Sequence, residues 1–159
     1  MVDDNLWFYD PESRKFSHTS LNEQFNDSDA NNSDFRASTL AGNYTVVSAE
    51  QARLGTHDVY ILGLEANSDE VTYPTMRVWV TASPYLVLKS EDYSAGGRLM
   101  RTSYYPSYTK AGGRYVANQM IFRDELIAGK QTRITISEIS TETLPDMIFT
   151  KSYVERVNN

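Results

Sequence analysis

At 159 residues the chain has the length of one domain, and 40% hydrophobic with 23% charged residues is typical of a globular protein rather than a disordered one. The net charge of −6 and the scattered basic residues argue against nucleic-acid binding, which needs a basic stripe. The absence of cysteine excludes disulfides and thiolate chemistry, and the 12% of aromatic residues favours β-structure.

No apolar run reaches the length that crosses a membrane. The first five residues contain neither the basic nor the apolar region of a signal peptide. The residues alone therefore predict either a cytosolic protein or a mature or trimmed form of an exported one.

The chain begins with a region of short elements. Two strands and then a polar loop are expected, at residues 6–9, 15–19 and 22–34. Ser33 or Asp34 can cap a short helix that runs through Leu40 and ends at Gly42.

From residue 44 onward, strands alternate with turn residues. Seven strands are expected, at residues 44–54, 57–66, 74–81, 85–93, 98–108, 114–124 and 131–139. Their regular spacing is typical of an antiparallel meander, sandwich or barrel in which each strand pairs with the next. The stretch after Leu144 is the one further helical candidate.

One face of this expected sheet is apolar. Side chains alternate between the two faces of a strand, which assigns nine residues to a shared apolar stripe: Met76, Val78, Val80, Leu86, Leu88, Met120, Phe122, Ile134 and Ile136. The opposite face is mixed, with Trp79, Val87 and Tyr93 among charged residues. So much apolar sheet with so little helix requires a closing barrel, a ligand or further chain to cover it.

The role of the apolar stripe stays open at this point. An ordinary packed core is favoured about two to one by the pattern alone. Methionine adapts to irregular apolar guests, however, so a ligand-facing role is the alternative.

Catalytic signals are weak. His18 and His57 are the two histidines, and neither lies near a nucleophile motif, so surface histidines are the better interpretation. Glu91 and Asp92 are adjacent on a strand and point to opposite faces, so they cannot act as a carboxylate pair.

Metal signals are also weak. The loop that starts at Asp27 begins like a calcium loop, but Asn32 stands where that motif needs glycine and Ser38 where it needs glutamate. Two separate histidines without cysteine make a zinc site improbable. We expect no metal and no cofactor.

Motifs along almost the whole chain carry a family resemblance. They are a Trp-Phe-Tyr-x-Pro segment within 5–16, Ser-Asp-Phe at 33–35, a tryptophan strand at 76–80 followed by Lys-Ser-Glu at 89–91, and the segments 97–100, 120–124, 132–136, 144–150 and 154–156. In this order they resemble the outer-membrane lipoprotein-sorting proteins, relatives of the periplasmic lipoprotein carrier LolA.

The resemblance implies a mainly β, half-open antiparallel barrel with one or two short helices. It implies that the nine stripe residues line a cavity for acyl chains. The implied role is that of a non-catalytic periplasmic carrier, or chaperone, which sorts lipoproteins to the outer membrane. An inner-membrane exporter and an outer-membrane acceptor are its implied partners.

One departure from the family concerns the beginning of the chain. Family members normally start with a signal sequence, a helix and further strands, so residues 1–159 are interpreted as the carboxy-terminal portion of a single sorting domain. Exposed sheet edges would then allow pairing between copies. Three alternatives remain: a carrier of free lipid or glycolipid that works with a membrane exporter, a structural module with a dry core, and an enzyme that uses a histidine.

Overall fold

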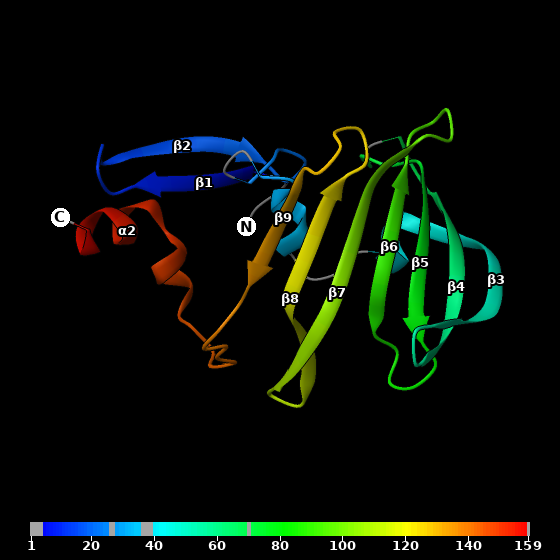
Figure 1. Ribbon diagram of the computed structural model, residues 1–159. Helices are drawn as coiled ribbons and strands as arrows, with labels where there is room; N and C mark the ends of the chain where they lie inside the picture. Colours follow the sequence, from blue (N-terminus) through cyan, green and yellow to red (C-terminus); the bar gives the residue numbers. More distant parts are fainter. Residues whose placement is uncertain (1–4, 26–27, 36–39, 70, 159) are drawn as a thin grey trace.

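The computed structural model describes residues 5–25, 28–35, 40–69 and 71–158, which form two antiparallel sheets (Figure 1). The smaller sheet is a hairpin of β1 (Asn5–Asp10) and β2 (Lys15–Ser20). Asp10 begins its turn, and the Asp10 carboxylate accepts hydrogen bonds from the Glu12 amide at 2.9 Å and the Ser13 hydroxyl at 2.6 Å. These bonds are typical of an aspartate that starts a turn before proline.

The larger sheet contains seven strands in sequence order. They are β3 (Tyr44–Leu54), β4 (His57–Ala66), β5 (Thr75–Thr81), β6 (Val87–Tyr93), β7 (Leu99–Ala111), β8 (Arg114–Asp124) and β9 (Gln131–Thr135). Each strand pairs antiparallel with the next, and β3 and β9 form the two edges of an open sheet. The predicted antiparallel meander is confirmed, and its strands lie close to their predicted positions.

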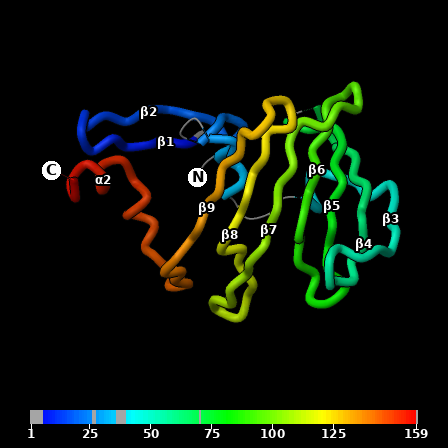
Figure 2. The backbone as a smooth tube through the Cα atoms, in the orientation of Figure 1, coloured from blue at the N-terminus to red at the C-terminus, as the bar shows by residue number. Residues whose placement is uncertain are grey.

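The open sheet leaves a large surface. The chain exposes 10869 Å², against about 8,100 Å² for a compact monomer of its mass. The hairpin stands to one side of the curved sheet and does not pack flat against it (Figure 2), which is consistent with this large surface.

Four short helical segments accompany the sheets among the described residues, where one or two were predicted. They are η1 (Asn32–Phe35), α1 (Leu40–Asn43), η2 (Asp146–Phe149) and α2 (Lys151–Val157). The predicted helix through Leu40 is only partly testable, because residues 36–39 lie outside the described part. No helix in the described ranges combines the length and apolar character needed to cross a membrane.

The helical segments cover different parts of the molecule. η1 and α1 lie behind the large sheet in Figure 1, and α2 lies beside the hairpin. On α2, the ammonium group of Lys151 lies 3.0 Å from the centre of the Trp7 ring, which is a cation–π contact between helix and hairpin.

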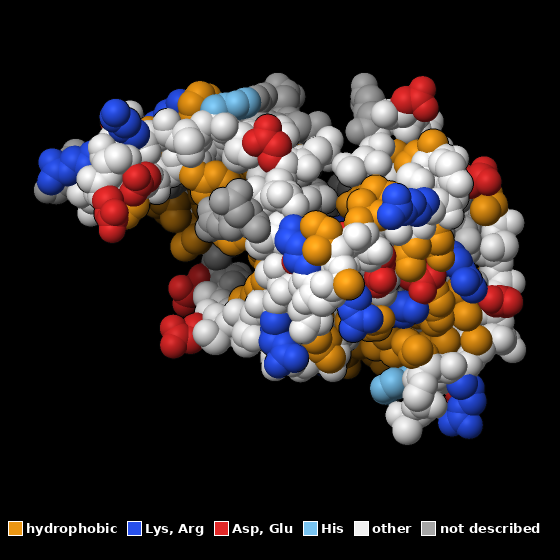
Figure 3. Space-filling model, turned by 45° about the horizontal axis from the view of Figure 1, so that its top comes forward, with side chains coloured by type: hydrophobic (Ala, Val, Ile, Leu, Met, Phe, Trp, Pro, Cys, Tyr) orange, Lys and Arg blue, Asp and Glu red, His pale blue; other side chains and the backbone are white. Residues whose placement is uncertain are grey.

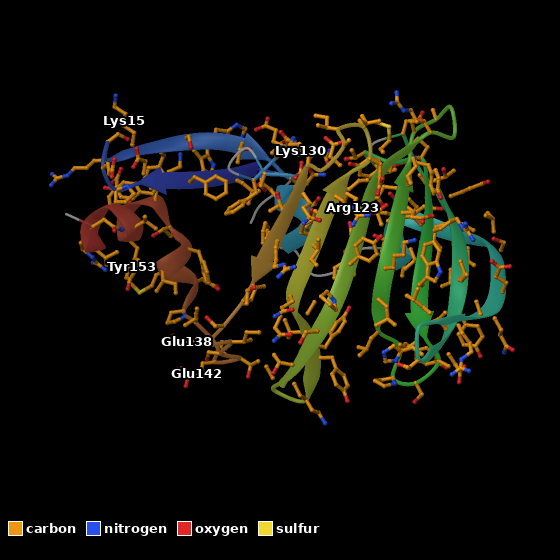
Figure 4. The ribbon with its side chains drawn as sticks, in the orientation of Figure 1. Lys15, Arg123, Lys130, Glu138, Glu142 and Tyr153 are labelled. Atoms are coloured by element: carbon orange, nitrogen blue, oxygen red, sulfur yellow. The ribbon has the colours of Figure 1, made fainter. Side chains whose placement is uncertain are left out.

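A polar loop was predicted between the hairpin and η1, but its polarity gave no sign that residues 29–32 are buried. Ala30 is fully buried and packs with Met120 and Phe122 of β8. The Asp29 amide donates to the Thr132 hydroxyl at 2.9 Å, and Lys130, labelled in Figure 4, forms a 3.1 Å ion pair with Asp29. These contacts fix the loop against one face of the sheet, which we call the cavity face.

Candidate functional site

A cavity of about 760 Å³ lies between the cavity face and the segments that cross it. Its floor comes from four central strands: Met76 and Val78 of β5, Val87, Ser90 and Asp92 of β6, Arg101, Tyr105 and Tyr108 of β7, and Ala117 and Met120 of β8. Its roof comes from η1 and α1, and its rim includes the connection from β4 to β5. A cavity of this volume is in the range that holds small ligands.

Four of the nine predicted residues line this cavity, and two more pack beside Met120 in the core. Met76, Val78, Met120 and Ile136 line it. Phe122 is fully buried, and Ile134 packs with it against Met120 in the core.

Val80, Leu86 and Leu88 are half-buried and are not among the described residues that line the cavity. A register shift between Trp79 and Val80 places Val80 opposite Val87. The shift leaves Leu88 of β6 as an extra residue without a partner on β5, which is a β-bulge. A bulge inverts the alternation of side chains beyond it. Val87 therefore lines the cavity, and its predicted position on the opposite face is wrong.

The middle of the cavity floor is charged rather than apolar. Arg101 of β7 donates from Nε to Asp92 of β6 at 2.8 Å. Its two terminal nitrogens donate to the two carboxylate oxygens of Asp34 in η1, at 2.7 and 3.2 Å. The side chains of Asp92, Asp34 and Arg101 are only 0, 11 and 12% exposed. We call these three residues the buried ion cluster.

Burial and pairing both act on the ionisation of the cluster. Burial raises the pKa of Asp92, and Arg101 opposes that rise without cancelling it. Burial tends to lower the pKa of Arg101, but Asp34 and Asp92 outweigh it and raise that pKa further. The guanidinium therefore stays charged, and Asp92 holds its proton more tightly than an exposed aspartate does.

The buried ion cluster was missed by the sequence analysis, which considered Asp92 only as a partner for its neighbour Glu91. The alternation of side chains along β6 and its pairing with β7 could have indicated the contact between Asp92 and Arg101. Asp92 shares its face with Ser90, and Arg101 pairs directly with Asp92 in the register between β6 and β7. Asp34, in contrast, comes from the Ser-Asp-Phe segment 67 positions earlier than Arg101.

Tyrosines surround the cluster and the cavity. The Tyr44 hydroxyl donates to the carbonyl of Tyr73 at 2.9 Å, and the Tyr108 hydroxyl donates to the carbonyl of Val87 at 2.5 Å. Burial raises the pKa of Tyr44, with a smaller contribution from Asp92, and burial alone raises that of Tyr108, in both cases to about 12. These groups are therefore neutral hydrogen-bond donors at physiological pH, already paired with backbone.

The opposite face of the large sheet, here the outer face, is mixed as predicted. Trp79 lies between Arg77, 5.1 Å from its ring centre, and Lys89, at 4.3 Å. Lys89 also forms a 2.6 Å ion pair with Glu91. Figure 3 shows the same mixture, with Lys and Arg side chains interspersed among hydrophobic and acidic ones over the sheet.

The two histidines are far apart in the topology. His57 is exposed at the start of β4, and His18 lies on β2, 4.8 Å from Trp7 between ring centres. Across the described ranges, no group of three His, Asp or Glu side chains is arranged to hold a metal ion. In the loop that begins like a calcium loop, Asp27 and Ser38 lie outside the described residues.

Comparisons with known proteins agree with this architecture. A family model described as an uncharacterized protein matches residues 1–156. No curated protein sequence matches the chain.

Three solved structures share the fold. A LolA superfamily protein from Nitrosomonas europaea is 30% identical, with a TM-score of 0.74 over 96% of this chain and 69% of its own. A domain assigned to outer membrane lipoprotein sorting in Vibrio parahaemolyticus is 22% identical, with a TM-score of 0.82 over 98% of this chain and 68% of its own. A DUF1329 family protein from Desulfovibrio piger is 23% identical, with a TM-score of 0.82 over 94% of this chain and 64% of its own.

The last two likenesses concern the fold, because their identity is low. The Nitrosomonas europaea protein is similar enough in sequence, over enough of both chains, to establish kinship. With its open antiparallel sheet and covered cavity, this chain belongs to the LolA superfamily.

Proposed function

We propose that this chain is the lipid-holding part of a non-catalytic carrier that shelters the acyl chains of lipoproteins and delivers them to the outer membrane. The observation that carries the proposal is the cavity of about 760 Å³ between the sheet and η1. Kinship with the LolA superfamily and the fold shared with the lipoprotein-sorting domain from Vibrio parahaemolyticus support it.

The physical reason for a carrier is the cost of exposing acyl chains to water. Each buried methylene group is worth about 0.8 kcal/mol, so a chain of roughly sixteen carbons gains on the order of 10 kcal/mol when sheltered. Met76, Val78, Met120 and Ile136 line the cavity and are proposed to contact the chain. Flexible methionine side chains adapt to such a guest without fixing its shape, which favours release.

The proposal includes the setting of the carrier. It places the chain in the periplasm, between an inner-membrane exporter and an outer-membrane acceptor. Residues 1–159 would form the carboxy-terminal portion of one lipoprotein-sorting domain. Pairing between copies would use the edge strands β3 and β9.

A non-catalytic role is favoured by the chemistry of the site. The cavity lining among the described residues contains neither histidine. Its charged groups, Asp34, Asp92 and Arg101, pair with one another in the buried ion cluster.

A cavity-blocking substitution tests the proposal. Ala117 lines the cavity, so Ala117→Phe places a ring inside it, whereas Ala95→Phe places the same ring in an exposed turn. We expect wild type and Ala95→Phe to bind a triacylated lipopeptide, and Ala117→Phe to bind it at least tenfold more weakly. A delipidated peptide that binds wild type as tightly as the triacylated one would refute the proposed function.

A further inference from the structure

One polar atom in the cavity wall has no partner among the described residues. It is Oδ1 of Asp92, a side chain that is fully buried and lines the cavity. The other carboxylate oxygen accepts from Arg101 Nε at 2.8 Å. A buried acceptor without a donor is costly, so Oδ1 favours any guest that brings a donor to it.

The charges around this atom do not balance. In the described part of the chain, the carboxylates of Asp34 and Asp92 share the one guanidinium of Arg101. Once the pH is high enough to ionise Asp92, whose pKa burial raises, the wall therefore carries a surplus negative charge at side chains that are largely shielded from solvent, where electrostatic interactions are strong. The hydroxyls of Tyr44 and Tyr108 already donate to backbone carbonyls.

Apolar side chains lie directly beside the cluster. Met76 of β5 is the register partner of Asp92, and Val78 is the partner of Ser90. A guest whose polar head displaces the groups that cover Asp92 Oδ1 can therefore place that head at Asp92 and its apolar chain along β5 at the same time. An amphipathic lipid has this combination of groups.

We propose, building on the lipid-carrier function, that the cavity selects neutral lipids whose head group donates a hydrogen bond to Asp92, and that it discriminates against free fatty acids. A hydroxyl or an amide N–H satisfies the free oxygen. A fatty-acid carboxylate has no proton to donate at neutral pH and adds a further negative charge beside the carboxyl groups of Asp34 and Asp92.

Three ligands with the same twelve-carbon chain test this selectivity. They are 1-dodecanol, a neutral donor; methyl laurate, neutral without a donor; and laurate, an anion. Their affinities for lipid-free protein are measured by displacement of a fluorescent fatty-alcohol probe at pH 8. The variant is Asp92→Asn, and its matched control is Asp58→Asn, at a side chain that is 80% exposed.

For wild type and Asp58→Asn, 1-dodecanol is expected to bind roughly tenfold more tightly than methyl laurate, and laurate most weakly. In Asp92→Asn the difference between laurate and 1-dodecanol should shrink to about twofold. Equal affinities of wild type for laurate and 1-dodecanol, or an unchanged ratio in Asp92→Asn, would overturn the selectivity while leaving lipid binding intact. Failure of all three ligands to bind would instead overturn the carrier function as well. If Asp92→Asn does not fold, the order of the three ligand affinities in the wild type decides whether the proposed selectivity holds.

Discussion

Replacing Arg101 with methionine tests how much the buried ion cluster contributes to the fold. The substitution keeps the apolar stem and removes the guanidinium that pairs with Asp34 and Asp92. Removing one partner of a buried ion pair leaves an uncompensated charge and typically costs about 3–5 kcal/mol. Domains are usually stable by about 5–15 kcal/mol, so Arg101→Met should fold but be strongly destabilised.

The assay is urea unfolding at pH 7, followed by tryptophan fluorescence. The matched control is Arg53→Met, because the ion pair between Arg53 and Asp58 is exposed and such pairs contribute little. A loss of less than about 1 kcal/mol in Arg101→Met would refute the reasoning that the cluster is a buried, mutually dependent unit.

The same substitution should also loosen the roof of the cavity. Asp34 accepts a hydrogen bond from the Asn31 amide at 2.7 Å in addition to those from Arg101. Without Arg101, η1 loses its ion pair to the sheet, and its amides should exchange with solvent faster. Unchanged exchange over residues 31–35, with normal exchange elsewhere, would show that η1 is held by other contacts.

Further predictions concern pH, the core and the outer face. Burial raises the pKa of Asp92 above its ordinary value of 3.8, so the folded state holds this proton to a higher pH than the unfolded state does. The free energy of unfolding should therefore fall as the pH rises above 3.8. Asp92→Asn should remove this fall when stability is measured by urea unfolding at several pH values. Phe122→Ala, at a fully buried ring, should cost about 3–5 kcal/mol, and Leu126→Ala, 43% exposed, far less, in the same unfolding assay. Trp79→Leu should lower the melting temperature yet leave lipid affinity unchanged, since Trp79 lies on the outer face.

The strand order was predictable because the local signals and the final structure agree. Turn residues such as Gly55, Gly97 and Gly113 have φ values of 59, 75 and 79°, a backbone region that favours glycine. They separate runs that alternate between apolar and polar residues. Each strand pairs with its sequence neighbour, so no long-range information was needed to order the sheet.

The centre of the site was not predictable in the same way. The extra residue on β6, Leu88, inverts the alternation of that strand, and nothing in the residues of β6 alone marks it. Asp34 reaches Arg101 only because the loop before η1 folds onto the cavity face, and that loop is polar in sequence. Ala30 is buried by tertiary contacts that its local sequence does not indicate.

The most direct test of the central claim is photo-crosslinking with a lipopeptide whose acyl chain carries a diazirine. After irradiation and proteolysis, mass spectrometry identifies the labelled residues. We expect labels on β5 and β8, at Met76, Val78 and Met120, which line the cavity, and we expect these labels to be lost in Ala117→Phe. Labels confined to the outer face around Trp79, or an unchanged pattern in Ala117→Phe, would contradict the claim that this cavity holds acyl chains.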